Sequence, residues 1–351
     1  MAKIASLIFT LLFIGAIVAA LVGGYLVYQF YFISPESEKD QYFAVEEGET
    51  VRTIALNLEE EGIIDHEVIF RLYVRWTGVD RDFQAGTFEL KPNMSMAALA
   101  TALTSPDVGV VRATIIEGWT LRDIGFLFEN KGMFQAEEIF EQAGLQAVDY
   151  MPLSIINPAE KWKEEFEFLA DKPRHVSLDG YLFPDTYYFF VDVSAEDVVR
   201  RMLKNFDKKI KPEWREEIDR QGKTIFEIVT MASIIEKEMY GLEARKMVSD
   251  IFWKRLEIGM PLQSDASVNY VTGKGLTRPS LEDTQVDSFY NTYKYPGLPL
   301  GPISNPSAEA IEAAIYPAPN EYYYFLNTAE GDIIYSKTHD EHVENKQKYL
   351  R

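Results

Sequence analysis

Residues 47–62 read EGETVRTIALNLEEEG, and residues 117–132 read EGWTLRDIGFLFENKG. The two stretches are identical at seven equivalent positions, so the chain contains an internal repeat with an offset of 70 residues. The shared residues are Glu47, Gly48, Thr50, Arg52, Ile54, Glu59 and Gly62 in the first copy, and Glu117, Gly118, Thr120, Arg122, Ile124, Glu129 and Gly132 in the second.

Each copy is predicted to form a short helix that follows a strand. The strands correspond to the apolar segments Tyr42–Val45 and Ala113–Ile116. Thr50 and Thr120 stand where a helix begins, and threonine is a favoured N-cap because its hydroxyl accepts a free backbone N–H. The glycine that closes each copy is predicted to end the helix.

A third, weaker copy at Lys91–Met96 leads into an apolar helix predicted at Ala97–Leu103. The order of strand, EGxT turn, helix and glycine resembles LysM-type modules, which are small βααβ units that bind the N-acetylglucosamine-rich glycans of cell walls. The resemblance implies a glycan-binding module at residues 41–110. The alternative is a structural duplication without a ligand, in which the second copy only frames the next domain.

The composition limits the classes of function. A chain of 351 residues, 47% of them hydrophobic, is long enough for two domains with separate cores. Its net charge of −20 and pI near 4.7 argue against a nucleic-acid partner, because phosphate binding needs clustered lysine and arginine. The absence of cysteine excludes disulfides, thiol catalysis and cysteine-ligated zinc.

The N-terminal segment has no charged residue between Lys3 and Glu36. The apolar run Ile4–Tyr28 exceeds the roughly 20 residues needed to cross the hydrocarbon core, so residues 4–34 are predicted to anchor the chain in the lipid bilayer. The positive charge before the run places residues 1–3 in the cytoplasm and the larger C-terminal part outside it. We therefore predict a single-pass protein of the cell membrane.

The alternative for this segment is a cleaved signal peptide, with Val18-Ala19-Ala20 as a poor cleavage site. The apolar run is longer than the roughly 7–15 residues of a signal-peptide core. The pattern favours an anchor that is not cleaved.

The middle of the chain, from about residue 135 to 222, mixes helical and aromatic patterns. Helices are predicted at Ala136–Ala143 and Ala195–Phe206, on either side of the segment Gly180–Tyr188, which reads GYLFPDTYY. Aromatic faces stack on sugar rings, so this segment could line a glycan cleft. The alternative is that its tyrosine and phenylalanine side chains form part of a core.

Thr224–Leu256 is predicted to form one long amphipathic helix, softened at Gly241, because its apolar residues recur with helical spacing. Glu236 and Lys237 project away from the apolar stripe, whereas Glu238 lies at its edge. A carboxyl group there would be desolvated, and its raised pKa would suit a general acid. The alternative is a structural salt bridge with Arg245 on the same face. The stripe consists of Ile228, Met231, Ile235, Met239 and Leu242.

Several motifs in the C-terminal half resemble the YceG-like family of endolytic murein transglycosylases. They occur in order, and with the anchor and the LysM-like part the resemblance covers nearly the whole chain. The motifs are Ala232-Ser233-Ile234-Ile235-Glu236-Lys237-Glu238, Gly259-Met260-Pro261-Leu262-Gln263-Ser264-Asp265, Tyr290-Asn291-Thr292-Tyr293, Gly297-Leu298-Pro299, Gly301-Pro302-Ile303 and Thr338-His339-Asp340-Glu341-His342.

The resemblance implies that Glu238, the second glutamate of the E-K-E motif, is the catalytic acid. It also implies lytic cleavage of peptidoglycan between N-acetylmuramic acid and N-acetylglucosamine, which leaves a 1,6-anhydro end and requires no cofactor. The substrate would be nascent glycan strands, and peptidoglycan synthases are candidate partners. Two other classes stay open, namely a glycoside hydrolase that pairs Glu238 with Asp265, and a wall-binding scaffold without catalysis.

Four further residues are predicted to bind substrate. Gln263 and Asp265 follow the turn after the long helix and could hydrogen-bond sugar hydroxyls or stabilise positive charge on the sugar. Asn291 and Tyr293 offer amide and phenol groups of the kind that sugar sites use. For each of the four, the alternative is a hydrogen bond that stabilises a turn.

A metal site is not predicted. His339 and His342 have a spacing that could suit a metal pair, but no HExxH motif, cysteine or third nearby histidine accompanies them. The predicted fold is therefore α+β, with a transmembrane helix at residues 4–34, a LysM-like βααβ module at 41–110 and a YceG-like catalytic domain at 111–351.

Overall fold

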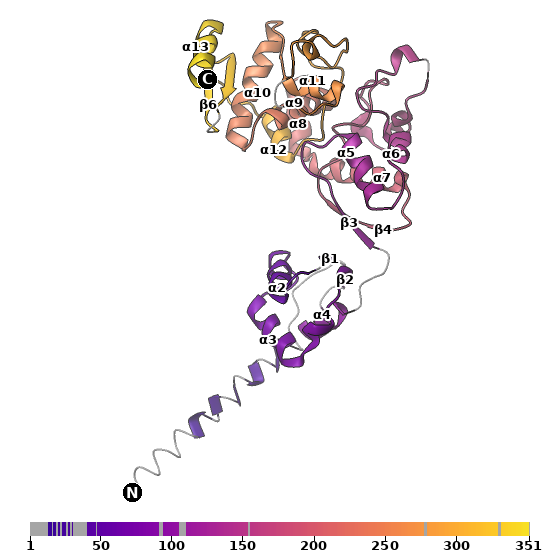
Figure 1. Ribbon diagram of the computed structural model, residues 1–351, viewed down its shortest axis with the longest axis vertical. Helices are drawn as coiled ribbons and strands as arrows, with labels where there is room; N and C mark the ends of the chain where they lie inside the picture. The colour runs from indigo at the N-terminus through magenta and orange to yellow at the C-terminus, as the bar shows by residue number, and fades with distance from the viewer. Residues whose placement is uncertain are drawn as a thin grey trace. The chain divides into compact units, whose positions relative to one another are not determined.

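The structure is a computed structural model. It describes residues 13–15, 17–18, 20–21, 23–25, 27–28, 30, 41–46, 48–90, 94–104, 110–153, 155–276, 279–328 and 331–350. The chain divides into two compact units (Figure 1). Unit 1 comprises Met1–Arg112 with Tyr188–Val191, and unit 2 comprises Ala113–Tyr187 with Asp192–Arg351.

Unit 1 is built on two antiparallel strands, β1 (Gln41–Val45) and β2 (Gly86–Leu90), in which Phe43 lies opposite Phe88. Both phenylalanines are buried in the core of the unit. Between the strands lie α2 (Val51–Glu60), α3 (Glu67–Thr77) and the short 3-10 helix η1 (Val79–Asp82), and α4 (Met96–Ala102) follows β2. The order strand, helix, helix, strand is therefore present in this unit.

The two copies of the repeat have the same local geometry. In both, threonine caps a ten-residue helix, α2 after Thr50 and α5 (Leu121–Asn130) after Thr120. The closing glycines, Gly62 and Gly132, have φ of +70° and +68°, a region that glycine enters without a Cβ clash. The predicted repeat is therefore confirmed over its described residues. Glu47 of the first copy lies outside the described residues, as do Lys91–Asn93 of the weaker third copy.

Unit 2 contains most of the helices. The division between the units falls within both β3 (Val110–Thr114) and β4 (Thr186–Phe190), which pair in a two-stranded sheet. The first elements after β3 are α5, α6 (Ala136–Ala143), and the 3-10 helices η2 (Met151–Leu153), η3 (Pro158–Glu164) and η4 (Glu167–Leu169). After β4 come α7 (Ala195–Lys209), α8 (Pro212–Arg220), α9 (Ile225–Glu238), α10 (Leu242–Glu257), α11 (Asp265–Thr272), η5 (Asp283–Gln285), α12 (Ala308–Ile315), β5 (Tyr324–Asn327), β6 (Ile333–Ser336) and α13 (His339–Tyr349).

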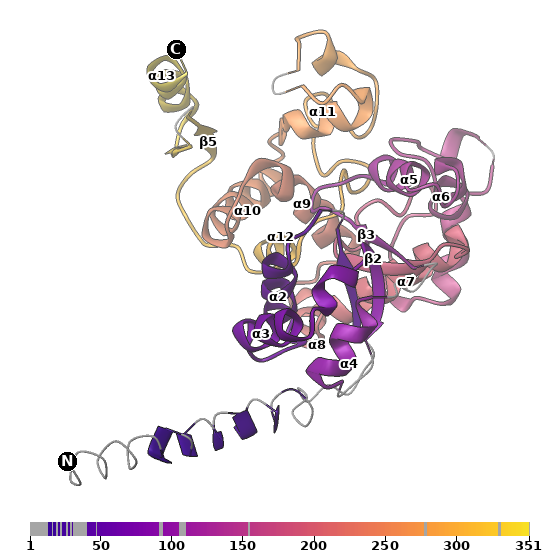
Figure 2. The ribbon, with the colours of Figure 1, turned by 60° about the horizontal axis from the view of Figure 1, so that its bottom comes forward.

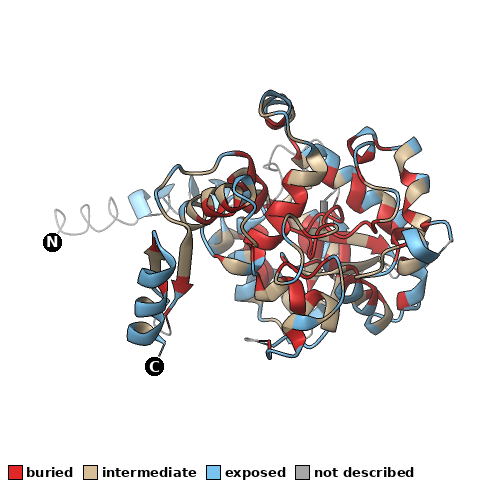
Figure 3. Ribbon diagram, turned by 90° about the horizontal axis from the view of Figure 1, so that it is seen from above, coloured by how far each residue is buried: buried red, intermediate tan, exposed pale blue. Residues whose placement is uncertain are grey.

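Helix α9 runs through the core of unit 2. Every residue from Ile228 to Glu236 is buried, and the helix packs against α8, α10, α11 and α12 (Figure 2). Buried positions are concentrated in such central helices, whereas outer helices alternate buried and exposed faces (Figure 3). A helix apolar on all sides must be enclosed by protein, so α9 is the element around which the unit is assembled.

The predicted long helix from Thr224 to Leu256 is wrong, because the chain leaves the helical conformation after Glu238. Met239 is extended, with φ of −140° and ψ of 148°, and Gly241 has φ of +81°. The helical wheel assumed one continuous axis, so its placement of residues beyond the break does not hold. Glu236, predicted to project outward, is in fact buried.

The aromatic segment before β4 belongs to the core. Tyr181 and Phe183 are buried, and the Tyr181 ring lies 5.3 Å from that of Phe206 in α7. Gly180 at the start of the segment has φ of +90°, and a Cβ there would lie 2.5 Å from Pro302. This close approach requires glycine. The core interpretation is thereby confirmed for the buried part of the segment.

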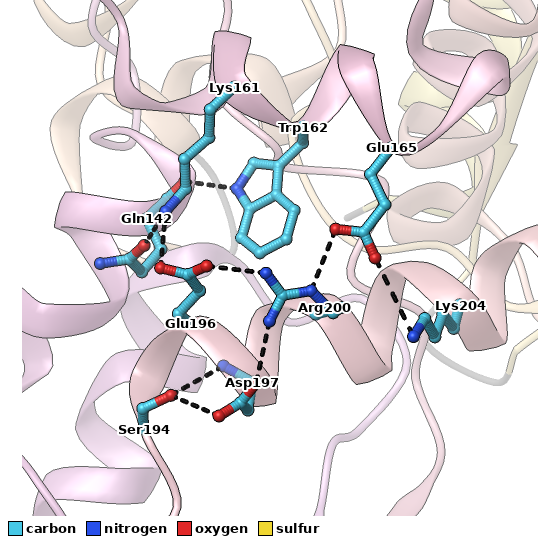
Figure 4. A network of polar contacts seen from close by, with 9 residues as sticks. All are labelled: Gln142, Lys161, Trp162, Glu165, Ser194, Glu196, Asp197, Arg200 and Lys204. Atoms are coloured by element: carbon cyan, nitrogen blue, oxygen red, sulfur yellow. Dashed lines mark hydrogen bonds and ion pairs between the residues drawn. The ribbon is translucent and has the colours of Figure 1, made fainter.

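A network of ion pairs and hydrogen bonds connects α7 to the segment that precedes β4. Figure 4 shows Arg200 paired with Glu165, Glu196 and Asp197, while the indole of Trp162 donates to the carbonyl of Gln142. Exposed ion pairs of this kind contribute little each, roughly 0–1 kcal/mol. The buried side chain of Trp162 is therefore expected to stabilise this contact more than any one of the ion pairs does.

The predicted anchor lies largely outside the described residues, including residues 4–12 and 31–34. The described positions from Phe13 to Phe30 are helical. Within the part of the chain that the structure describes, no helix is both long and apolar enough to cross a membrane. Phe30 is buried in the core of unit 1, where its ring lies 5.0 Å from that of Tyr73.

Candidate active site

The site begins at the C-terminal end of α9. A capping box formed by Thr224 and Glu227 fixes the first turn of this helix, and Glu238 is its last residue. The extended Met239 and the fully exposed Tyr240 follow, so the Glu238 carboxyl group is presented at a helix end. The negative end of the helix dipole favours the neutral form of a carboxyl group at this position.

The carboxyl group of Glu238 is held by a single hydroxyl. Ser264 donates its Oγ–H to Glu238 Oε1 at 2.6 Å. Burial raises the pKa of Glu238; the Ser264 hydrogen bond lowers it, the Asp265 charge raises it and the Arg255 charge lowers it, with burial the largest effect. A carboxylic acid with a raised pKa keeps its proton to higher pH, which suits it to donate that proton to a substrate oxygen.

Asp265 lies at the first position of α11 and is oriented by a phenol. Tyr293 donates its hydroxyl to Asp265 Oδ1 at 2.6 Å, and both side chains are partly exposed. The charges of Asp265 and Glu238 both contribute to raising the pKa of Tyr293 above its usual range, after burial. The structure therefore brings Glu238, Asp265 and Tyr293 together, as the prediction of a shared site requires.

Thr292 connects the two loops that carry these residues. Its carbonyl accepts the backbone N–H of Gln263 at 3.2 Å, and its hydroxyl accepts that of Ser264 at 3.0 Å. The side chain of Gln263 is exposed, and its φ of +53° is unusual for a residue other than glycine. Such backbone strain is commonly found at functional sites.

Asn291 does not meet the expectation of a substrate ligand. Its side chain is fully buried, and its amide donates to the carbonyls of Thr284 and Val286 at 3.0 and 2.9 Å. Its Oδ1 accepts the backbone N–H of Tyr293 at 3.0 Å. All of these partners are main-chain groups of its own loop, so the turn-stabilising alternative describes Asn291, and the residue positions Tyr293.

Arg255 is the positively charged residue of this site. It is buried in α10 and donates to the carbonyls of Tyr323 at 2.7 Å and Leu262 at 2.9 Å. Its guanidinium lies 5.0 Å from the ring centre of Tyr324 in β5. Because it joins α10, the loop before α11 and β5, it fixes the surroundings of Glu238 without a direct ion pair to that residue.

Arg245 is ion-paired with the other glutamate of the motif, Glu236. The predicted alternative of a bridge from Glu238 to Arg245 is wrong, because Arg245 forms its ion pair with Glu236 at 2.7 Å. The break after α9 turns α10 away from the continuous helix that the prediction assumed. Glu238 is thus free of a cationic partner at salt-bridge distance among the described residues.

The second copy of the repeat contributes to the support of α9. Lys237 donates to the carbonyl of Gly118 at 3.1 Å, and the N–H of Gly118 donates to the carbonyl of Asn305 at 2.8 Å. Asn305 in turn accepts the N–H groups of Gly180 and Leu182. The EGWT turn therefore helps to frame the site, as the structural alternative for this copy supposed.

The two C-terminal histidines lie beside the aromatic residues of β5. His342 stacks on Tyr324 with ring centres 5.1 Å apart, and burial lowers its pKa to about 4. Among the described residues no group of three or more histidine and acidic side chains is arranged to hold a metal.

A separate surface cavity of about 920 Å³ in unit 2 is lined by Tyr150, Ile156, Glu160 and Arg174, among others. None of its lining residues belongs to the group around Glu238, so we do not assign it to the site.

Sequence reasoning missed Ser264, Thr292 and Arg255. Ser264 stands between Gln263 and Asp265 in one of the family motifs, and its place in that motif could have identified it as a site residue. Arg255 carried no signal, since its partners lie in distant segments of the chain.

The chain is similar to known proteins along nearly its whole length. The profile of the YceG-like family matches residues 43–348. The chain is 32% identical over 341 residues to the endolytic murein transglycosylase of Bacillus subtilis (strain 168), covering 94% of this chain and 91% of that protein. It is 31% identical to the protein of the same name from Streptococcus pneumoniae (D39), covering 93% of this chain but only 62% of that longer protein.

A solved structure is also similar. The crystal structure of a yceG-like protein from Listeria monocytogenes superposes with a TM-score of 0.60 at 30% sequence identity. The match covers 88% of this chain and 99% of the Listeria chain. The mixed α+β architecture is therefore shared with a solved relative.

The hydrogen bond from Ser264 predicts a measurable change in titration. In Ser264→Ala the charged form of Glu238 loses its donor, and this hydrogen bond lowers the pKa, so we expect the titration midpoint of Glu238 to rise. Because the folded pKa of Glu238 is raised above its unfolded value, stability falls as pH rises from the unfolded pKa to the folded pKa, and the variant extends this fall to higher pH. Side-chain carbon NMR, with Glu238→Gln for assignment, measures the midpoint.

The control is Ser280→Ala, which removes a hydroxyl bonded to Asp283 instead. It should leave the Glu238 midpoint in place. An unchanged or lower midpoint in Ser264→Ala would show that this hydroxyl does not stabilise the carboxylate.

Proposed function

The chain belongs to the YceG-like family, and from this membership we propose that it is a lytic transglycosylase acting on peptidoglycan. It would cleave the bond between N-acetylmuramic acid and N-acetylglucosamine and leave a 1,6-anhydro ring. The observation that carries the proposal is one carboxyl group, Glu238, with a raised pKa at a helix end and no cationic partner at salt-bridge distance among the described residues.

One carboxyl group suffices for this chemistry. Glu238 donates its proton to the bridging oxygen, and the bond from that oxygen to C1 of the muramyl residue breaks. The resulting carboxylate then takes the proton of the C6 hydroxyl, whose oxygen bonds to C1 and closes the ring. The nucleophile is part of the substrate, so proximity replaces an activated water, and the proton is restored to Glu238.

The neighbours of Glu238 fit the two halves of this reaction. The Ser264 hydroxyl stabilises the carboxylate that exists between the two proton transfers. The carboxylate of Asp265 would stabilise positive charge on the sugar, and the hydrogen bond from Tyr293 holds it in place. Gln263 is exposed at the same loop and would contact a sugar hydroxyl.

A two-carboxylate hydrolase would use Asp265 as nucleophile or base. The Tyr293 hydroxyl occupies one oxygen of Asp265 and reduces its nucleophilicity, so the geometry favours the lytic reaction. The nature of the reducing end distinguishes the two reactions, because only the lytic one leaves anhydro ends.

We predict that Glu238→Gln abolishes most of the cleavage while the protein remains folded. Glutamine keeps an oxygen that accepts the Ser264 hydrogen bond, but it has no proton to donate. The loss of general acid–base catalysis typically costs about 10² to 10⁴-fold. Mass spectrometry of products from purified sacculi measures the loss, and near-normal activity would exclude this mechanism.

The matched variant is Asp265→Asn. If Asp265 acts as an electrostatic ligand, the variant should retain slow cleavage with anhydro products. Complete loss of turnover, or hydrolytic ends in the wild type, would instead support the two-carboxylate hydrolase.

We further propose that residues 4–34 anchor the chain in the cell membrane with residues 1–3 in the cytoplasm. The support is the absence of charge between Lys3 and Glu36. Anchoring would hold the catalytic part near the nascent strands and near the synthases that make them.

A reporter that is active only outside the cytoplasm, fused after Arg351, should be active and remain in the membrane fraction. A soluble active fusion with a new N-terminus near Ala20 would support a cleaved signal peptide.

We also propose that residues 41–110 form a LysM-like module that holds the glycan strand. The support is the strand, helix, helix, strand order of unit 1 together with the EGxT turn. Deletion of residues 41–110 should weaken retention on insoluble sacculi more than it slows cleavage of short soluble glycans. Retention equal to that of the full chain would exclude a glycan-binding role.

A further inference from the structure

A buried ion pair lies two residues before Glu238 and takes no part in the chemistry proposed above. Arg245 in α10 donates from Nη2 to Glu236 Oε1 at 2.7 Å, and the two residues are only 3% and 7% exposed. Burying two charges costs several kcal/mol of desolvation, which a single contact rarely recovers. The other hydrogen bonds of the two side chains therefore indicate what the pair does.

The guanidinium of Arg245 donates three further hydrogen bonds. Its Nε donates to the carbonyl of Met239 at 3.0 Å, and its Nη1 donates to Ser307 Oγ at 2.9 Å and to Glu309 Oε2 at 3.2 Å. Met239 is the residue directly after Glu238, and its carbonyl lies where the helical hydrogen-bond pattern has ended. Arg245 thus contacts the main chain that carries the acid.

The second oxygen of Glu236 is directed to the start of α12. Ser307, the N-cap of that helix, donates both its backbone N–H at 2.9 Å and its hydroxyl at 2.5 Å to Glu236 Oε2. The pair therefore joins three points in unit 2, namely the end of α9, the beginning of α10 and the N-cap of α12.

We propose that Glu236 and Arg245 are positioning residues, which hold the break between α9 and α10 and thereby fix the Glu238 carboxyl group against Ser264. The inference rests on the proposed function for its activity measurement. The planar fork of arginine can bond Glu236, the Met239 carbonyl and Ser307 at once, whereas the single ammonium of lysine cannot match this geometry. A small displacement of a catalytic group is sufficient to slow a reaction strongly.

The first variant is Arg245→Lys, which keeps the charge and removes the fork. We expect kcat on soluble glycan fragments to fall about 10- to 100-fold with KM nearly unchanged, because a misplaced acid weakens only the transition state. We also expect the titration midpoint of Glu238 to move down towards its ordinary value, because a displaced side chain is less buried.

The second variant separates positioning from stability. Glu236→Leu combined with Arg245→Met replaces the pair by apolar side chains, an exchange that often preserves the free energy of unfolding. We expect this double variant to remain folded and to keep a low kcat. Full activity of the folded double variant would overturn the inference. If the double variant does not fold, Arg245→Lys alone decides.

A matched control is available on the same two helices. Lys246 and Glu312 also pair α10 with α12, at 2.8 Å, but both are partly exposed and neither contacts the end of α9. Lys246→Met should leave kcat, KM and the Glu238 midpoint at wild-type values.

The two proposals fail in different ways. A wild-type chain without activity on glycan would contradict the proposed function, and the Glu238 midpoint in Arg245→Lys would still decide the positioning role. An active wild type together with wild-type kcat and midpoint in Arg245→Lys would contradict the positioning role alone.

Discussion

The burial of helix α9 governs the arrangement of the whole site. This helix is buried from Ile228 to Glu236 and has exposed or partly exposed residues only at its two ends. It stops because Met239 adopts an extended conformation and Gly241 takes a positive φ. Glu238 consequently lies at the end of the buried stretch, where its side chain is partly exposed and burial raises its pKa.

Two glutamates in one short motif have opposite environments. Glu236 is enclosed with the cation Arg245 and with the hydrogen-bond donors of Ser307. Glu238 has one hydroxyl donor, Ser264, and a like charge nearby at Asp265. The same functional group therefore stands in an ion pair at one position and beside a hydroxyl donor at the other. Environments that differ in this way are a common feature of acid–base sites.

The repeat shows how one local unit can serve two purposes. Both copies have a capped ten-residue helix and a closing glycine with the same backbone geometry. In unit 1 the copy lies between paired strands β1 and β2 around a core of its own. In unit 2 the turn of the copy is bonded instead to Lys237 and Asn305, beside α9. Local sequence sets the geometry, and the surrounding chain sets its use.

Features whose causes lie within a few residues could be predicted from the sequence. The threonine caps, the glycine ends and the helices Ala136–Ala143 and Ala195–Phe206 all follow from local hydrogen bonding and periodicity. The motif around Glu238 also identified the family. Only the tertiary structure decided the helix break, the pairing of Arg245 with Glu236 and the burial of Asn291. Ser264 and Ser307 lie 26 and 71 residues from their glutamate partners, and a helical wheel describes only one continuous helix, so contacts of this range become known only when the chain is folded.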